Sequence, residues 1–276
     1  MRRVTTTGVL RMLALALVAL WSGFPILFLL VSSFKPPRDI LAFPPTVLFA
    51  PTLDNYRALI ARWPEFFDAL LNSLIITVGA TLLTVVVTTL AGYVYSRVRN
   101  RATALSAFFM ILIRMVPPIV ITLPLFPVIN RLGLNDTHFV LIVLYATFFV
   151  SLNTWIMKAF MDQIPREMDE AATIDGGTLL QTLRYVIVPL ASQGMIAAST
   201  FVLIFSWNEF LFAFIFTTTE ARTAPLIISE MIGAIDSVDW GVLFAAASLQ
   251  LLPILIFVVA VQKYVVAGLA AGSLKG

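Results

Sequence analysis

Few residues of this chain have the types and spacing that catalysis or metal binding requires. The 276 residues contain no cysteine and a single histidine, His138. Thiolate chemistry is therefore excluded, and a metal site built from Cys or His clusters is not supported. No GxxxxGK[ST] sequence is present, so the chain has no P-loop for nucleotide phosphates. The neighbouring acids Asp236 and Asp239 lie just before an apolar run and are typical of a solvated turn.

The polar residues that remain of interest lie inside long apolar runs. Arg114 falls ten residues into one run, and Asn208 and Glu209 fall in the outer half of another. An arginine at mid-membrane costs on the order of 3 kcal/mol, so Arg114 should face protein or water. Asn208 and Glu209 offer donors and acceptors suited to a polyhydroxylated solute. Two interpretations stay open for all three residues, namely a solute path and a structural contact with a freed carbonyl or a partner helix.

The elements that carry these residues are expected to be transmembrane helices. The chain is 60% hydrophobic and only 12% charged. Its apolar runs are continuous rather than alternating, and each is long enough for the ~20 residues that cross ~30 Å of hydrocarbon. We expect an all-α integral membrane protein with one domain over residues 1–276. The six expected spans are approximately residues 12–31, 70–95, 104–129, 139–156, 195–216 and 242–261.

Prolines interrupt the third expected span. They stand at Pro117, Pro118, Pro124 and Pro127. Proline inside a helix frees backbone carbonyls, which protein or water must then satisfy. We therefore expect this span to kink or unwind.

The distribution of basic residues orients the chain. Six spans place both termini on one side, which then holds eleven of the 18 lysines and arginines, against six on the other side and Arg114 within a span. The positive-inside rule then predicts cytoplasmic N- and C-termini. It also places the polar segment 165–189, between spans four and five, in the cytoplasm.

The segment 165–189 predicts two short helices joined by a turn. Acidic residues dominate its start, as suits the positive end of a helix dipole. Gly176 and Gly177 can end the first helix. Thr178 and Gln181 have the spacing of a capping box that begins a second helix. Taken alone, this pattern fits an ordinary surface hairpin as well as a docking element.

The same segment resembles the cytoplasmic loop of permease subunits of binding-protein-dependent ABC importers. That loop has the form Glu-Ala-Ala, three residues, Gly, nine residues, Ile-x-Leu-Pro. The matching residues here are Glu170, Ala171, Ala172, Gly176 and Pro189, with Val186 and Val188 in the Ile and Leu positions.

Other stretches resemble the carbohydrate branch of that family, in particular the smaller permease of maltose-type importers. The resemblance covers nearly the whole chain. The matching stretches are Ser33 to Pro36, Asp54 to Tyr56, Asn72-Ser73, Trp207 to Phe210, and Gly268 to Gly276.

The resemblance implies a type I ABC importer permease fold with a coupling helix between spans four and five. In that family the coupling helix docks on a cytoplasmic ATPase subunit. Glu170 would supply the polar contact, Ala171 and Ala172 the surface of close approach, and Gly176 the turn. The residues implied for ATPase coupling are Glu170, Ala171, Ala172, Asp175, Gly176 and Pro189.

The resemblance also implies a set of partners. These are a second permease in a heterodimer, two ATPase subunits that hold ATP and Mg²⁺, and an extracytoplasmic solute-binding protein. The chain would bind no cofactor and no nucleic acid, would lie in a bacterial-type plasma or inner membrane, and would import a sugar or similar polar solute without hydrolysing ATP itself.

The alternative is an ion-coupled secondary transporter in which Arg114 and Glu209 are the coupling charges. That alternative lacks an inverted repeat and assigns no role to the loop at Glu170.

Overall fold

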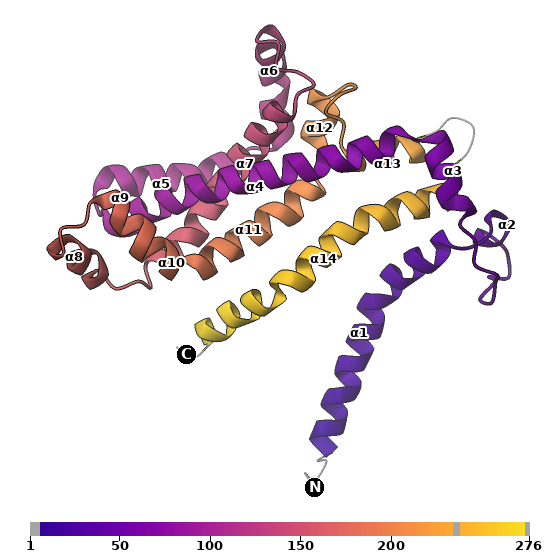
Figure 1. The fold of residues 1–276 in the computed structure, drawn as a ribbon, viewed down its shortest axis with the longest axis horizontal. Coiled ribbons are helices and arrows are strands. Elements are labelled where there is room, and N and C mark those ends of the chain that lie inside the picture. The colour runs from indigo at the N-terminus through magenta and orange to yellow at the C-terminus, as the bar shows by residue number, and fades with distance from the viewer. Residues whose placement is uncertain (1–5, 234–237, 274–276) are drawn as a thin grey trace. The chain divides into compact units, whose positions relative to one another are not determined.

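The computed structural model describes residues 6–233 and 238–273, and side chains within 10–233 and 238–262. The prediction of an all-α fold is confirmed for these ranges, where helices alternate with turns and no strand occurs (Figure 1). Contacts divide the chain into two compact units, which are described separately. The first comprises the residues up to Phe66 together with Ile228–Pro253, and the second comprises Phe67–Ile227 and the residues from Ile254 onward.

The first unit contains three helices from the N-terminal part of the chain and parts of two later helices. Its elements are α1 (Thr6–Ser33), α2 (Pro37–Ile40), α3 (Asp54–Arg62), the end of α13 (Ala224–Ile232) and the start of α14 (Trp240–Ser273).

Buried Asn55 joins the parts of this first unit. Its Nδ2 donates to the backbone oxygens of Ser33 and Lys35, each at 2.8 Å. The Tyr56 hydroxyl lies 2.8 Å from Ser33 Oγ. A Cβ at Gly241 would collide with Asn55 Oδ1, so glycine there allows α14 to approach α3. The stretches Ser33 to Pro36 and Asp54 to Tyr56, separate in sequence, thus meet in one buried polar contact.

The second unit is a helical bundle built around α7. Its α4 begins at the last residues of the first unit, and the described end of α14 also belongs to it. The helices are α4 (Glu65–Arg97), α5 (Arg101–Arg114), α6 (Pro118–Arg131), α7 (His138–Met161), α8 (Glu167–Ile174), α9 (Leu179–Thr182), the π-helix η1 (Leu183–Ile187), α10 (Val188–Leu190), α11 (Ser192–Trp207), α12 (Leu211–Phe216) and the start of α13, up to Ile227. In Figure 1, α8 and α9 lie at one end of this unit and α6 and α12 at the other.

Four helices of the described chain are long and apolar enough to cross a membrane, and six spans result if each of two bent helix pairs counts as one. The four are Leu10–Ser33, Glu65–Arg97, His138–Met161 and Trp240–Gln262. One bent pair is α5 with α6, and the other joins Leu179–Leu190 to α11.

The interruption expected in the third span is a sharp bend. The axes of α5 and α6 differ by 94°. The break falls just before Pro118, where Pro117 has φ −59° and ψ 137°, the extended conformation that a following proline favours. Pro124 and Pro127 lie within α6.

The region expected as the fifth span, residues 195–216, contains a helix break that its apolar sequence does not predict. The helix α11 ends at Trp207, and α12 begins at Leu211. The aromatic side chains of α12 then pack on α7, with the rings of Phe212 and Tyr145 6.0 Å apart between centroids. Because these side chains are buried, α12 is held in the core of the second unit.

Candidate functional site

The helix α8, the glycine turn at Gly176 and Gly177, and the helix α9 form one bent segment, residues 167–182, which we call the elbow. Three acidic residues occupy the first turn of α8, where they complement the helix dipole. Gly176 has φ +79°, a conformation that glycine adopts without strain. The Gly177 N–H donates to Ala172 O at 2.9 Å, which satisfies a carbonyl at the helix end. The predicted glycine turn is therefore confirmed.

The predicted capping box that begins α9 is also confirmed. Thr178 Oγ1 accepts from the Gln181 N–H at 3.4 Å, and Gln181 Oε1 accepts from the Thr178 N–H at 2.8 Å. The turn between α8 and α9 is thus defined by hydrogen bonds on both sides of the two glycines.

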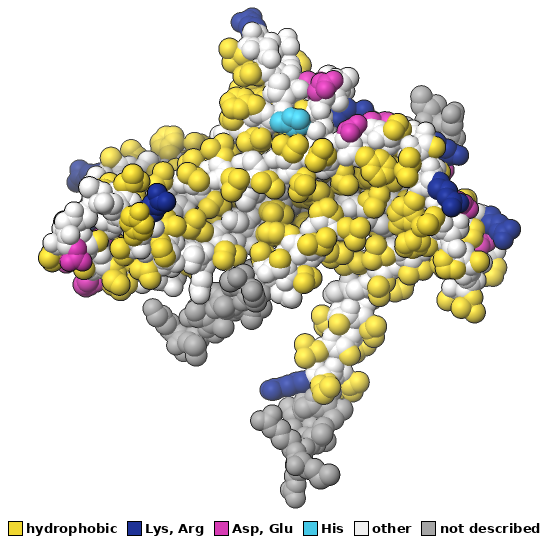
Figure 2. Space-filling view, in the orientation of Figure 1, with side chains coloured by type: hydrophobic (Ala, Val, Ile, Leu, Met, Phe, Trp, Pro, Cys, Tyr) yellow, Lys and Arg dark blue, Asp and Glu magenta, His cyan; other side chains and the backbone are white. Residues whose placement is uncertain are grey.

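The outer surface of this elbow is exposed and partly apolar. Glu170 and Ala171 are exposed, and Figure 2 shows acidic side chains at this end of the unit. Ile174 is 85% exposed and Leu180 is 74% exposed. Large apolar side chains at such exposure in a polar loop are typical of a surface that another protein covers.

A shallow hollow of about 310 Å³ lies on the same elbow. Ala172, Asp175 and Gly176 line it, so three of the expected coupling residues share one surface. Pro189 does not line it, because that residue lies beyond η1 on α10. It stands where η1 passes into the bend before α11.

An ion pair attaches α8 to the end of α4, and sequence reasoning missed it. Arg97 Nε donates to Asp169 Oδ2 at 2.9 Å, and the two side chains are only 12% and 19% exposed. The Tyr93 hydroxyl donates to Asp169 Oδ1 at 2.8 Å. Asp169 is thus held by two side chains from the last turns of α4 while its neighbour Glu170 faces outward. Local patterning carries no signal for a pair 72 residues apart.

Backbone contacts strengthen the same attachment. Arg97 Nη1 donates to Met161 O at 3.2 Å, and Arg97 Nη2 donates to Ile164 O at 3.1 Å. From the other side, Arg166 Nη2 donates to Ser96 O at 3.1 Å. We call Tyr93, Arg97, Arg166 and Asp169 the α4–α8 clamp. Because the Arg97–Asp169 pair is charge-assisted and shielded from water, α8 and the end of α4 should move together.

The helix α4 is also tightly packed on α7 just before the clamp. A Cβ at Gly92 would come within 2.7 Å of Met157 Cβ and 2.9 Å of the Lys158 backbone nitrogen. Glycine therefore allows two long helices to touch nearly backbone to backbone. The elbow is therefore attached to a closely packed pair of helices, α4 and α7.

Arg114 makes a structural contact with α7. Its Nη1 donates to Phe148 O at 3.2 Å, and its guanidinium lies 5.0 Å from the centroid of the Phe148 ring. That carbonyl belongs to α7, not to the proline-interrupted span that carries Arg114. The side chain otherwise remains exposed in this single chain.

Asn208 and Glu209 form the break between α11 and α12. Asn208 Nδ2 donates to Ile204 O at 2.8 Å, near the end of α11. Glu209 accepts at Oε1 from the Phe212 N–H at 2.9 Å and at Oε2 from the Ala213 N–H at 3.3 Å. The pair thus satisfies backbone groups that a broken helix leaves free.

The two helix breaks meet at one aromatic cluster. Arg114, at the end of α5, lies over Phe148. The Phe148 ring is in edge contact with Phe212, 6.0 Å between centroids, and Phe212 donates its N–H to Glu209. Arg114 and Glu209 therefore both connect to one aromatic pair, Phe148 on α7 and Phe212 on α12.

A second feature that sequence reasoning missed is a loop contact at Asp136. Its carboxylate accepts four backbone N–H groups at 2.9–3.0 Å. The donors are Thr218, Thr219, Glu220 and Ala221. Burial alone would raise the pKa of Asp136, but these bonds outweigh it and hold that pKa well below its ordinary value.

The stretch Asn72-Ser73 fastens the same loop to α4. Asn72 Nδ2 donates to Glu220 O at 2.8 Å, and Ser73 Oγ accepts the Ala224 N–H at 2.9 Å. His138 Nε2 lies 2.7 Å from Asn72 Oδ1. The single histidine is therefore a partner in a loop anchor, and the loop after α12 is held from both α4 and the α6–α7 turn.

Two features of the sequence fall outside the described residues. One is Asp236 of the acidic pair before the last apolar run, and the other is the last three residues of the Gly268 to Gly276 stretch.

Comparisons with known proteins agree with this architecture. Residues 84–270 match the family described as binding-protein-dependent transport system inner membrane component. The trehalose/maltose transport system permease protein MalG of Thermococcus litoralis is 34% identical over 278 residues, covering 100% of both chains. The trehalose transport system permease protein SugB of Mycobacterium tuberculosis is 36% identical over 280 residues, covering 100% of this chain and 99% of that protein.

The fold also matches a solved structure. A chain in the crystal structure of a bacterial ABC transporter that imports the acidic polysaccharide alginate superposes with a TM-score of 0.79 at 21% identity, over 96% of this chain and 98% of that one. This likeness shows the type I permease fold. The chain thus belongs to the family of binding-protein-dependent transport system inner membrane components, and it is a permease subunit of an ABC importer.

Proposed function

We propose that this chain forms half of the translocation path for a sugar and that it couples to an ATPase subunit through α8. The observation that carries the proposal is the elbow at Glu170, which presents an exposed docking surface while the α4–α8 clamp secures its inner side. The solute class rests on relatives whose names specify trehalose and maltose transport.

The proposed assembly contains four further components. A second permease completes the path, two ATPase subunits bind ATP and Mg²⁺ in the cytoplasm, and a solute-binding protein delivers the sugar outside. The N- and C-termini and α8 lie in the cytoplasm, as the excess of basic residues on that side supports. Because family membership accounts for the loop at Glu170, the ion-coupled alternative is not favoured.

The coupling residues have distinct roles in this proposal. Glu170 makes the charged contact with the ATPase, Ala171 and Ala172 let the two surfaces approach closely, and Asp175 and Gly176 shape the turn. When ATP draws the ATPase subunits together, α8 is displaced. The Arg97–Asp169 pair then carries that displacement into α4.

The path residues lie where the helices break. Broken helices are tolerated at membrane depth only where protein or water satisfies the freed backbone. We infer that Arg114, Asn208 and Glu209 border the solute path in the assembled importer. Their contacts with α7, α11 and α12 at the two helix breaks support this proposal.

The substitution Glu170→Lys tests the docking role. It should weaken association with the ATPase by about tenfold or more, because a buried interfacial charge would be reversed. Co-purification with tagged ATPase and ATP-driven sugar uptake in vesicles would measure the effect. The matched control is Glu167→Lys, which changes the same charge one turn earlier on α8. Normal association and uptake in Glu170→Lys would contradict the assignment of α8 as the coupling helix.

A further inference from the structure

The first unit contains a cavity that the coupling mechanism does not use. Its volume is about 610 Å³, within the ~300–1,000 Å³ typical of small-molecule sites. The lining comes from α2, the end of α3, α13 and the start of α14. All of the lining residues belong to the first unit.

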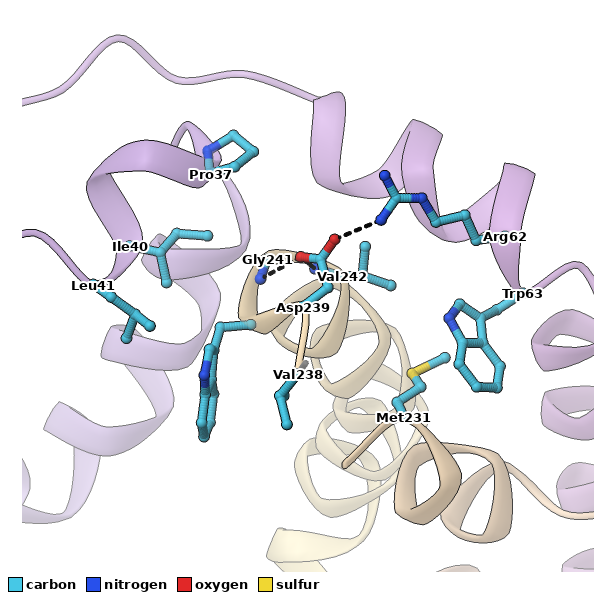
Figure 3. A pocket seen from close by; sticks show the side chains of 11 residues that line it. Pro37, Ile40, Leu41, Arg62, Trp63, Met231, Val238, Asp239, Gly241 and Val242 are labelled. Atoms are coloured by element: carbon cyan, nitrogen blue, oxygen red, sulfur yellow. Dashed lines mark hydrogen bonds and ion pairs between the residues drawn. The ribbon is translucent and has the colours of Figure 1, made fainter. Parts of the chain in front are cut away.

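Charged groups of both signs stand at this cavity. Arg62 Nη1 donates to Asp239 Oδ2 at 2.8 Å, and Figure 3 shows the two side chains meeting across the cavity. Asp239 Oδ1 also accepts the N–H groups of Gly241 and Val242, each at 3.2 Å, which fixes the carboxylate at the start of α14. The Arg62 and Asp239 side chains are 63% and 43% exposed, so both can still bond a ligand.

Aromatic and apolar groups complete the lining. Trp63 and Trp240 both line the cavity, and Trp240 is 40% exposed. The backbone of Trp63 is fixed at the end of α3, because its backbone N–H donates to Leu59 O at 2.9 Å. In Figure 3 the Trp63 indole lies beside Met231, on the side of Arg62. The cavity therefore combines two indole side chains with a pair of hydrogen-bonding charges.

This combination favours a neutral polyol over an ion. An anion would approach Arg62 only beside the Asp239 carboxylate, and a cation would meet the opposite conflict. A sugar hydroxyl can donate to Asp239 Oδ2 and accept from the unused Arg62 N–H groups. The apolar C–H face of a sugar ring can meanwhile pack against an indole, as large aromatic surfaces do in binding sites.

We propose that this cavity is a saccharide-binding subsite on the permease itself. Trp63 supplies the stacking surface, and the Arg62–Asp239 pair binds the hydroxyls. The proposal rests on the proposed function in taking the transported solute to be a sugar, but it concerns residues remote in sequence from Arg114, Asn208 and Glu209.

The test is sugar binding to the complete importer in lipid nanodiscs without its solute-binding protein. Saturation-transfer NMR would monitor titrations with trehalose and with maltose. Trp63→Ala and Arg62→Gln should each weaken binding by about tenfold, whereas Trp63→Phe should stay within about threefold of the natural chain. The matched control is Arg57→Gln, on the same helix α3 but outside the cavity.

The same preparations separate this proposal from the proposed function. ATP-driven uptake with the solute-binding protein present tests the importer role independently of direct binding. Equal sugar binding by the natural chain, Trp63→Ala and Arg62→Gln would overturn the subsite even where uptake is ATP-driven. Tighter binding of glycerol 3-phosphate than of trehalose would also overturn it, because the cavity would then prefer an anion such as a lipid headgroup. Weakened sugar binding confined to the two cavity variants would support it.

Discussion

Asp169→Arg should reduce ATP-driven uptake on the order of 100-fold while the protein still inserts in the membrane. The substitution places a second cation against Arg97 in a contact where the natural side chains are 12% and 19% exposed. Breaking a shielded ion pair costs about 3–5 kcal/mol. About 3 kcal/mol lowers the population of chains in which α8 is attached to α4 by on the order of 100-fold. The measurement is uptake in vesicles, with membrane insertion quantified in the same samples.

Exchanging the charges of Arg97 and Asp169 distinguishes loss of the ion pair from a general disruption of the fold. The double variant Asp169→Arg with Arg97→Asp restores an ion pair and should recover part of the uptake. Recovery should be incomplete, because an aspartate at 97 cannot donate to the carbonyls of Met161 and Ile164. Asp162→Asn, which removes the charge from the more exposed Lys158 pair, is the matched control and should change little. Uptake by Asp169→Arg equal to that of the control would contradict the clamp.

Asp136→Ala should lower the free energy of unfolding by about 2–4 kcal/mol, because four backbone donors lose a charged acceptor. Asp136→Asn should fall between the natural chain and Asp136→Ala, since an amide oxygen replaces only part of the carboxylate's accepting capacity. Thermal unfolding in detergent measures the loss. Asp54→Ala removes a carboxylate that is 59% exposed and should have a much smaller effect.

The pH dependence of the Asp136 contact has a definite sign. Its pKa is lowered in the folded protein, so the ionised form stabilises the fold. That stabilisation is complete above the unfolded pKa of about 3.9 and is lost only as the pH falls through the lower folded value. The stability difference between the natural chain and Asp136→Asn should therefore be constant from about pH 5 to pH 8. A difference that disappears near pH 6 would contradict this account of the loop.

Sequence alone predicted the features that depend on local chemistry. Continuous apolar runs predicted the helices, glycine at 176 predicted the turn, and Thr178 with Gln181 predicted the cap. The prolines predicted an interruption in the third expected span, although not the 94° bend. In each case the residues that determine the conformation lie within a few positions of one another.

Features set by distant residues were not predictable in the same way. The break after Trp207 contains neither proline nor glycine, and it depends on Glu209 accepting backbone N–H groups of α12 while α12 packs on α7. Local patterning does not mark Arg97 as a partner of Asp169, because the two residues are 72 positions apart in the sequence. The loop contact at Asp136 likewise joins residues 82 to 85 positions apart.

Site-specific crosslinking tests the proposed coupling surface most directly. Because the chain contains no cysteine, Ala171→Cys or Leu180→Cys introduces a single thiol on the exposed elbow. A short thiol–amine crosslinker added to the complete importer should then join this chain to a P-loop ATPase subunit, with a yield that changes when ATP binds. Thr218→Cys, in the loop held by Asp136, should give no such product. Absence of an ATPase adduct at both elbow positions, or an equal yield at position 218, would contradict the assignment of α8 as the coupling helix.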